Sequence, residues 1–336
     1  MGQDDSIVAL ADIKTLQENL NADVPIFLLI DPIAGEPLPN ALAAPGTLEA
    51  REAIWQLPIT DIQLSPRTPL QLHQRPYIVA LEGIDDPVLE QTLEIAHAER
   101  LKSQSEGLDG LGIAVHRVGG WLQTSQSAEE LAAQLSTLFK ITLNTTTATK
   151  ASYLRLPDRR TLSLVQHVIG DARMSAALGH IQQWLYLDVQ GKIATLKGSA
   201  SDAVKLRFDH PEWAQIEQGN VLHPALALCL GEMARHGKTR MHTQPVQALY
   251  EALFPACQRA QKAAKVWPQR FPLPIDQSIW AALCLLHPAI ETNQAVTQLL
   301  KDTGTEHEPT QPLRYIQHQV KACLTTPPSQ FVLAAN

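Results

Sequence analysis

The sequence predicts an α/β region, with a mixed sheet and flanking helices, over residues 1–200, followed by an all-α region over residues 201–336. Three observations predict this division. Short apolar runs bounded by turn residues alternate with helical patterns through the first 200 residues. Beyond about residue 205 there is no convincing strand pattern, and Pro and Gly separate stretches of helix length. The length of 336 residues also agrees with two domains of roughly 150 residues each.

Four apolar segments of the first region are candidate strands. Ile26–Ile30 is flanked by a proline on one side and an Asp-Pro pair on the other, as expected of a buried strand with a turn at each end. Tyr77–Leu81 follows an Arg-Pro pair in the same way. Gly112–Val115 and Tyr153–Leu156 are the other two candidates.

Helices and a hairpin are expected around these strands. Ser127 begins a capping-box pattern, in which Glu130 returns the backbone hydrogen bond, and leucines then form an apolar stripe on a helix that runs to Phe139. Two more helices are predicted over residues 161–169 and 171–178. Residues 184–196 alternate around a central turn, which predicts a β-hairpin. The threonine-rich tract 144–150 fits either a loop or an edge strand.

The helical region contains apolar stripes and several aromatic residues, six of which we single out. Stripes at helical spacing predict buried faces. Most of the aromatic side chains are expected in the core, with one or two exposed as anchors for a partner. These aromatic residues are Trp213, Tyr250, Phe254, Trp267, Phe271 and Trp280.

The charge is unevenly distributed along the chain. The net charge is −7 overall, whereas residues 1–150 alone carry 9 basic and 20 acidic side chains. An acidic first half argues against a nucleic-acid surface there, because phosphate binding requires clustered Lys and Arg. The longest apolar run, Ile279–Leu286, is too short for a membrane span. Together with an acidic N-terminus that lacks a secretory pattern, this favours a cytoplasmic protein with no nucleic-acid or membrane partner.

Motifs that carry chemistry are missing. The chain contains no phosphate loop, no nucleophile elbow and no dinucleotide fingerprint. The four cysteines are widely spaced among helix-forming residues, which favours reduced, buried thiols over disulfides or metal ligands. We therefore expect no catalytic residue, no cofactor and no metal site.

One charged turn stands out from this background. The segment from Tyr153 to Arg160 ends an apolar run and leads directly into a helix. Asp158 is placed to cap that helix or to pair with Arg155 or Arg160, which would fix how the strand and the helix meet. The alternative is an arginine-rich corner that receives an acidic partner or a phosphate.

Around this charged turn, the sequence resembles that of the adaptor chaperones of the bacterial type VI secretion system, the Tap or TEC proteins. That family has an Arg-aromatic-aromatic-Asp-Pro-Arg motif that leads into a helix. Arg155, Asp158 and Arg160 match its charged positions, whereas Leu, Pro and Arg occupy the other three. The resemblance covers roughly residues 24–195 and depends on the order of several features: an apolar strand ending in Asp31, the strand at 75–81, the helix at 128–139, the motif, and Trp184 followed by a hairpin.

The resemblance implies a non-enzymatic adaptor that binds a toxic effector and loads it onto the VgrG spike protein. Its two regions would each hold one partner. The residues that it singles out, as structural or partner-binding groups, are Asp31, Arg155, Asp158, Arg160 and Trp184.

Two other classes of function stay open at this level. A hydrolase or transferase could have an unrecognised site near Asp31, Arg155, Asp158 and Arg160, because charged groups at strand ends often line ligand crevices. A regulatory module that reads a small ligand is the third possibility, and only the fold class favours it.

Overall fold

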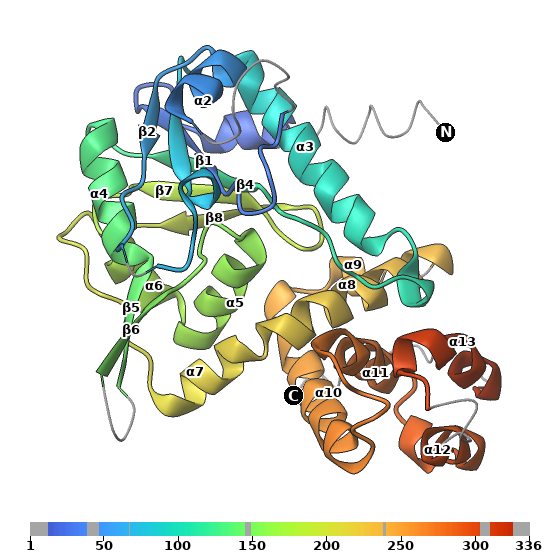
Figure 1. Cartoon of the computed structure of the whole chain (residues 1–336). Coiled ribbons are helices and arrows are strands. Elements are labelled where there is room, and N and C mark those ends of the chain that lie inside the picture. The colour runs from blue at the N-terminus through green and yellow to red at the C-terminus, as the bar shows by residue number, and fades with distance from the viewer. Residues whose placement is uncertain are drawn as a thin grey trace. The chain divides into compact units, whose positions relative to one another are not determined.

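The computed structural model describes residues 13–38, 47–66, 68–144, 149–237, 240–302 and 310–324 (Figure 1). The chain divides into two compact units, the first comprising residues 1–100 and 115–216 and the second comprising residues 101–114 and 217–336. The expected boundary at residue 200 differs from this division in two respects. The first unit continues to residue 216, and the segment 101–114 belongs to the second unit.

A six-stranded sheet with the order β2-β3-β1-β4-β7-β8 forms the framework of the first unit. Neighbouring strands are antiparallel throughout, so the sheet is not mixed in strand direction, which the alternation of strands and helices does not determine. A separate antiparallel ribbon consists of β5 and β6, and residues 145–148 of the threonine-rich tract lie outside the described residues. The strands are β1 (Ile26–Ile30), β2 (Ile59–Asp61), β3 (Tyr77–Leu81), β4 (Val118–Gln123), β5 (Lys140–Asn144), β6 (Thr149–Tyr153), β7 (Gln183–Leu187) and β8 (Ile193–Lys197).

Helices cover both faces of this sheet (Figure 1). Successive strand side chains point to opposite faces. In β1, Phe27 and Leu29 therefore join one core, whereas Ile26, Leu28 and Ile30 join the other. The helices are α2 (Leu48–Trp55) and α3 (Pro87–Gln104) on one face and α4 (Ala128–Leu138), α5 (Arg159–Ile169) and α6 (Asp171–Leu178) on the other, with η1 (Leu72–Gln74) and α7 (His210–Glu217) in the connections.

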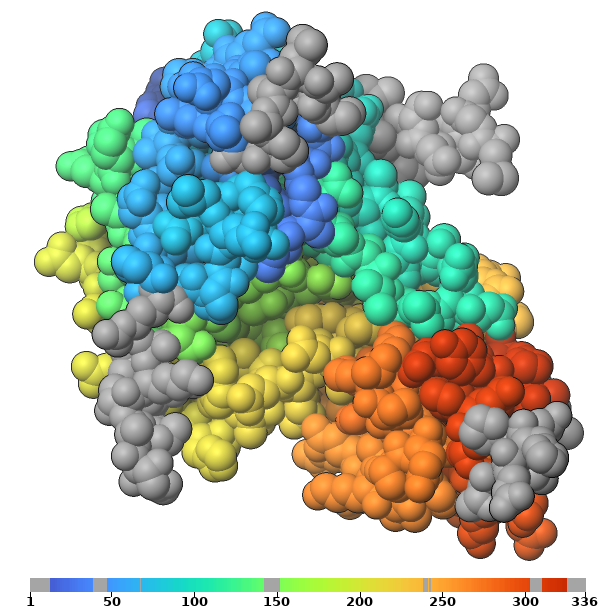
Figure 2. All heavy atoms as spheres, in the orientation of Figure 1, coloured from blue at the N-terminus to red at the C-terminus, as the bar shows by residue number. Residues whose placement is uncertain are grey.

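The second unit is helical, so the predicted fold class is confirmed. Its central helix α11 contacts α8, α10 and α13, and the apolar run at its centre is buried. Figure 2 shows the surface that α10 to α13 form, in orange to red. The elements are η2 (Gly107–Asp109), α8 (Gly219–Arg235), α9 (Arg240–Thr243), α10 (Val246–Val266), α11 (Pro274–Leu286), η3 (Ile290–Thr292), α12 (Gln294–Lys301) and α13 (Leu313–Cys323). Among the described helices, none has the length and apolar character needed to span a bilayer.

Several predicted elements are confirmed. The strands at 26–30 and 77–81, the helix at 171–178 and the hairpin of β7 and β8 occur where expected. The hydroxyl of Ser127 accepts from the backbone N–H of Glu130, and the carboxylate of Glu130 accepts from the backbone N–H of Ser127. Local sequence patterns therefore predict these elements correctly.

The predicted strand Gly112–Val115 is wrong. Gly112 has a φ of +62°, which a strand residue does not adopt. A Cβ there would lie 2.4 Å from the carbonyl oxygen of Pro224, so the backbone of this irregular segment packs closely against α8. The strand in this part of the chain is β4, a few residues later. It begins with Val-Gly-Gly, a sequence that resembles a turn and so hides the strand. The candidate strand Tyr153–Leu156 is also mostly wrong, because β6 ends at Tyr153 and residues 154–156 lie outside any strand.

Candidate functional site

The charged residues singled out by the sequence lie together in the first unit. Asp31 follows β1, Arg155 follows β6, and Asp158 and Arg160 lie at the start of α5. Arg155 Nε is 2.5 Å from Asp31 Oδ2, and Arg155 Nη1 is 3.5 Å from Asp158 Oδ2. Arg160 Nη2 is 2.7 Å from the same Asp158 oxygen. We call these four residues the charged corner, in which carboxylates and guanidinium groups alternate.

Asp158 is the N-cap of α5, as expected. Its carboxylate accepts a hydrogen bond of 3.1 Å from the backbone N–H of Arg160 and binds the Arg160 guanidinium through Nε and Nη2. Burial alone would raise the pKa of Asp158, but the paired Arg160, together with Arg155, holds this pKa well below its usual range. The carboxylate is therefore ionised, and the negative charge stabilises the helix N-terminus.

Asp31 lies in a different electrostatic environment. Its side chain is only 1% exposed, and this burial raises its pKa to about 6 despite the opposing effect of Arg155. Its backbone N–H donates to the carbonyl of Arg117 at 2.7 Å, which holds the end of β1 beside β4. The carboxyl of Asp31 can consequently gain or lose a proton near neutral pH.

One polar atom of the charged corner and one of the neighbouring Tyr153 have no hydrogen-bond partner among the described residues. They are Nη2 of Arg155 and the hydroxyl of Tyr153, both buried. Burial and then Asp31 raise the pKa of Tyr153, so the phenol is protonated. The remaining charged groups of the corner bind one another, which suits a role in joining strand ends to α5.

A second pair of buried charges was not predicted from the sequence. Arg159, 3% exposed, donates to the carbonyl of Ala96 at 2.7 Å and lies 3.4 Å from the carboxylate of Glu99. Burial lowers the pKa of Arg159 to about 10, with Glu99 opposing, and burial raises the pKa of Glu99. Arg159 occupies the position of the proline in the family motif, and no local pattern indicates its partner on α3, 60 residues earlier.

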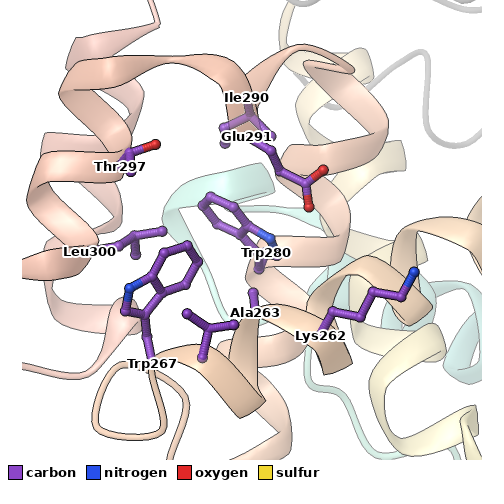
Figure 3. A pocket seen from close by; sticks show the side chains of 9 residues that line it. Lys262, Ala263, Trp267, Trp280, Ile290, Glu291, Thr297 and Leu300 are labelled. Atoms are coloured by element: carbon purple, nitrogen blue, oxygen red, sulfur yellow. The ribbon is translucent and has the colours of Figure 1, made fainter.

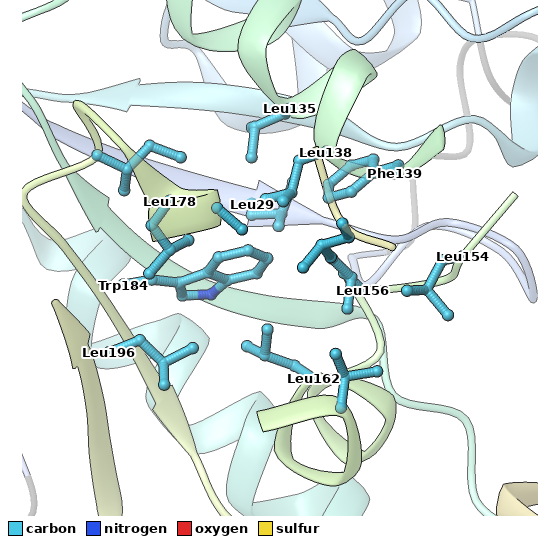
Figure 4. Packing of buried hydrophobic residues seen from close by; sticks show 14 of the residues in the cluster. Leu29, Leu135, Leu138, Phe139, Leu154, Leu156, Leu162, Leu178, Trp184 and Leu196 are labelled. Carbon is cyan, nitrogen blue, oxygen red and sulfur yellow. The ribbon is translucent and has the colours of Figure 1, made fainter. Parts of the chain in front are cut away.

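Trp184, the fifth predicted residue, lies apart from the charged corner in the core. Its indole N–H donates to the carbonyl of Gly119 at 3.0 Å, and its ring packs among leucines of α4, α5 and α6 (Figure 4). Leu156, next to the corner, belongs to the same cluster. Trp184 therefore packs in the core below the segment that contains the charged corner. Its buried ring offers no surface to a partner.

An apolar pocket in the second unit is the other candidate site. It has a volume of about 200 Å³ and lies between the end of α10, α11, η3 and α12 (Figure 3). Its apolar lining includes Val266, Trp267, Trp280, Ile290 and Leu300, and its polar lining consists of Lys262, Glu291 and Thr297. Of the six aromatic residues named from the sequence, Trp267 and Trp280 thus line a cavity. None of the six is exposed, so the expectation of one or two exposed anchors is wrong.

No protein-family model, curated protein or solved structure matches this chain. Within the described ranges, no three His, Cys, Asp or Glu side chains are placed to hold a metal ion together. Cys229, Cys257 and Cys284 are free and buried, as expected, whereas Cys323 is half-buried.

Proposed function

We propose that this protein is a non-enzymatic, cytoplasmic adaptor that binds a type VI secretion effector and loads it onto the VgrG spike. The observation that supports this most is the pairing within the charged corner. The residues that match the family motif, Arg155, Asp158 and Arg160, use their charges on one another and on Asp31. Groups that fix a framework in this way suit a binding protein better than a reaction site.

The arrangement of the other family-like features also supports the proposal. The strand that ends in Asp31, the strand at 77–81, the helix at 128–138 and the hairpin after Trp184 all belong to the first unit. Their side chains share two cores on the faces of one sheet. The features that occur in the family's order are thus parts of one folded unit, and the second unit, with its apolar pocket, is available for a different partner.

Affinity purification from the native host tests the proposal. The tagged full-length chain should retain a VgrG protein and a toxin, identified by mass spectrometry, and an unrelated tagged protein of similar charge should retain neither. Recovery of neither partner under conditions in which the secretion system is expressed would contradict the proposal.

One observation favours the second candidate, a hydrolase or transferase. A buried carboxyl whose pKa lies near 6, such as that of Asp31, is found more often at functional sites than elsewhere. Purified protein should then hydrolyse a simple ester or phosphomonoester, and Asp31→Asn should abolish the turnover. Turnover that survives this substitution would exclude Asp31 as a catalytic residue.

A further inference from the structure

The apolar pocket of the second unit contains an unusual tryptophan. Four tryptophans are almost completely buried: Trp55, Trp121, Trp184 and Trp280. The indole N–H groups of the first three donate to acceptors at 2.9, 3.1 and 3.0 Å. The N–H of Trp280 has no acceptor among the described residues, although its side chain is 1% exposed. Buried indole N–H groups usually find a partner, and the residue that carries this unpaired donor lines the pocket.

We propose that this pocket binds one large apolar side chain of a partner protein, beside an acidic residue of the same partner. A backbone carbonyl next to the apolar side chain accepts the hydrogen bond from Trp280 Nε1, and the acidic residue pairs with Lys262. The inference does not rest on the secretion proposal, because it names only the chemistry that the pocket recognises.

The size of the pocket selects a side chain rather than a metabolite. Its volume of about 200 Å³ lies below the roughly 300–1,000 Å³ of typical small-molecule sites. Trp280 lies at the inner end of the pocket, and the ring centroid of Phe271 is 6.0 Å from that of Trp280. In Figure 3, Trp267 and Leu300 lie on one side of the Trp280 ring. A pocket of this size suits a single anchor side chain, and such anchors dominate protein–protein affinity.

The rim of the pocket is apolar and basic. Val266, at the end of α10, is 64% exposed although it lines the pocket. Glu291 on the rim is already bound to Arg259 at 2.9 Å. Lys262 and Lys265 are exposed and form no ion pair within the described part of the chain, and their spacing of three residues places them side by side on α10. The unbalanced charge at the rim is therefore positive, which favours an acidic partner.

Selection from a phage-displayed library of random dodecapeptides tests the proposal with the full chain as bait. Enriched peptides should contain a large apolar residue with Asp or Glu nearby. Thr297→Phe, which places a ring in the pocket, should remove the enrichment, whereas Thr292→Phe, an exposed threonine outside the lining, should leave it unchanged. Equal enrichment on both variants would overturn the proposal.

Affinity for an enriched peptide, measured by fluorescence anisotropy, provides the quantitative test. Lys262→Glu should weaken binding by about tenfold, and Lys301→Glu, an exposed lysine outside the pocket, by less than about twofold. Trp280→Phe keeps an aromatic ring but removes the donor, and should also weaken binding by about tenfold. In the ¹⁵N spectrum of the wild type, the indole resonance that this variant lacks should shift when the peptide binds. Binding without that shift, or without loss in Lys262→Glu, would overturn the proposal.

Two controls identify other occupants. Thermal unfolding shows whether Thr297→Phe folds, and the exposed Lys262→Glu carries the test if it does not. A dimer that disappears in Thr297→Phe would show that a second copy fills the pocket, and tighter peptide binding after deletion of residues 325–336 would show that the chain's own end fills it. Either result would overturn the assignment to a partner protein.

Discussion

Buried arginines connect separate segments of this protein. Arg51 binds Glu36 at 3.1 Å and Asp61 at 2.6 Å and lies over the ring of Tyr77. Arg270, 5% exposed, donates to the backbone carbonyls of Leu299, Gln311 and Asp302 at 2.6–2.7 Å. Guanidinium groups suit this role because they carry several donors in a fixed plane and keep their charge when buried.

Arg159 should be far more important for stability than an exposed arginine. Arg159→Ala removes the buried guanidinium beside the carboxylate of Glu99 and leaves it only the partly exposed Arg117, at 3.9 Å, which should lower the free energy of unfolding by about 3 kcal/mol. Arg173→Ala removes an exposed ion pair with Glu212 and should cost less than about 1 kcal/mol. Denaturant unfolding of both variants measures the difference, and equal losses would contradict the account.

The carboxyl of Asp31 should make stability depend on pH. Its folded-state pKa of about 6 exceeds the usual value of 3.8, so folding favours the protonated form. The contribution of this group is complete below about pH 4 and is lost as the pH rises through 6. Between these limits the wild type should lose about 2 kcal/mol relative to Asp31→Asn, which cannot ionise.

Denaturant unfolding of both proteins at several pH values measures this loss. The ¹³C shift of the Asp31 carboxyl should titrate with a midpoint near 6. A constant difference in stability, or a midpoint below 4, would show that Arg155 outweighs burial at this site.

At the scale of elements, the tight packing of β4 depends on Gly120. Its φ is +127°, and a Cβ there would lie 2.3 Å from the carbonyl oxygen of Leu185. Gly120→Ala should therefore destabilise the protein by about 3 kcal/mol or more. Gly35→Ala is the matched control, because Gly35 also has a positive φ, of +103°, but open space around it, and it should cost about 1 kcal/mol. Similar losses in thermal unfolding would mean that backbone strain, not the close approach to β7, matters at Gly120.

Local sequence patterns predicted the helix caps and the hairpin well. The features that the sequence did not predict depend on tertiary contacts. The capping box at Ser127, the cap at Asp158 and the hairpin after Trp184 each depend on residues within a few positions of one another. The charged corner was expected as a cluster because its members lie at strand and helix ends. The partner of Arg159 and the pocket around Trp280 depend on helices that meet only in the folded chain, so no spacing in the sequence indicates them.

At the scale of the whole molecule, the segment Leu101–Ala114 belongs to the helical unit despite its distance in sequence. The backbone N–H of Leu108 donates to Glu232 at 2.9 Å, and Asp109 binds Arg235 at 2.6 Å and Lys321 at 2.7 Å. A cut at residue 200 would remove this segment from the second unit.

A fragment of residues 217–336 should therefore be incomplete. A synthetic peptide of residues 101–114 should bind it and raise its unfolding midpoint, with a gain of about 2.7 kcal/mol when the peptide is at 100 times its dissociation constant. A peptide with Leu108→Asp should have no effect, because Leu108 is buried. A fragment that unfolds cooperatively and whose unfolding midpoint neither peptide changes would contradict the assignment of residues 101–114 to the second unit.

Reconstitution with the proposed partners, as purified proteins, tests the proposed adaptor function most directly. The full chain, mixed with a VgrG trimer and a toxin from the same gene cluster, should form a ternary complex in size-exclusion chromatography with light scattering, and no partner should be chemically altered. Absence of any complex at micromolar concentrations, with covalent change in an added substrate that Asp31→Asn abolishes, would contradict the account.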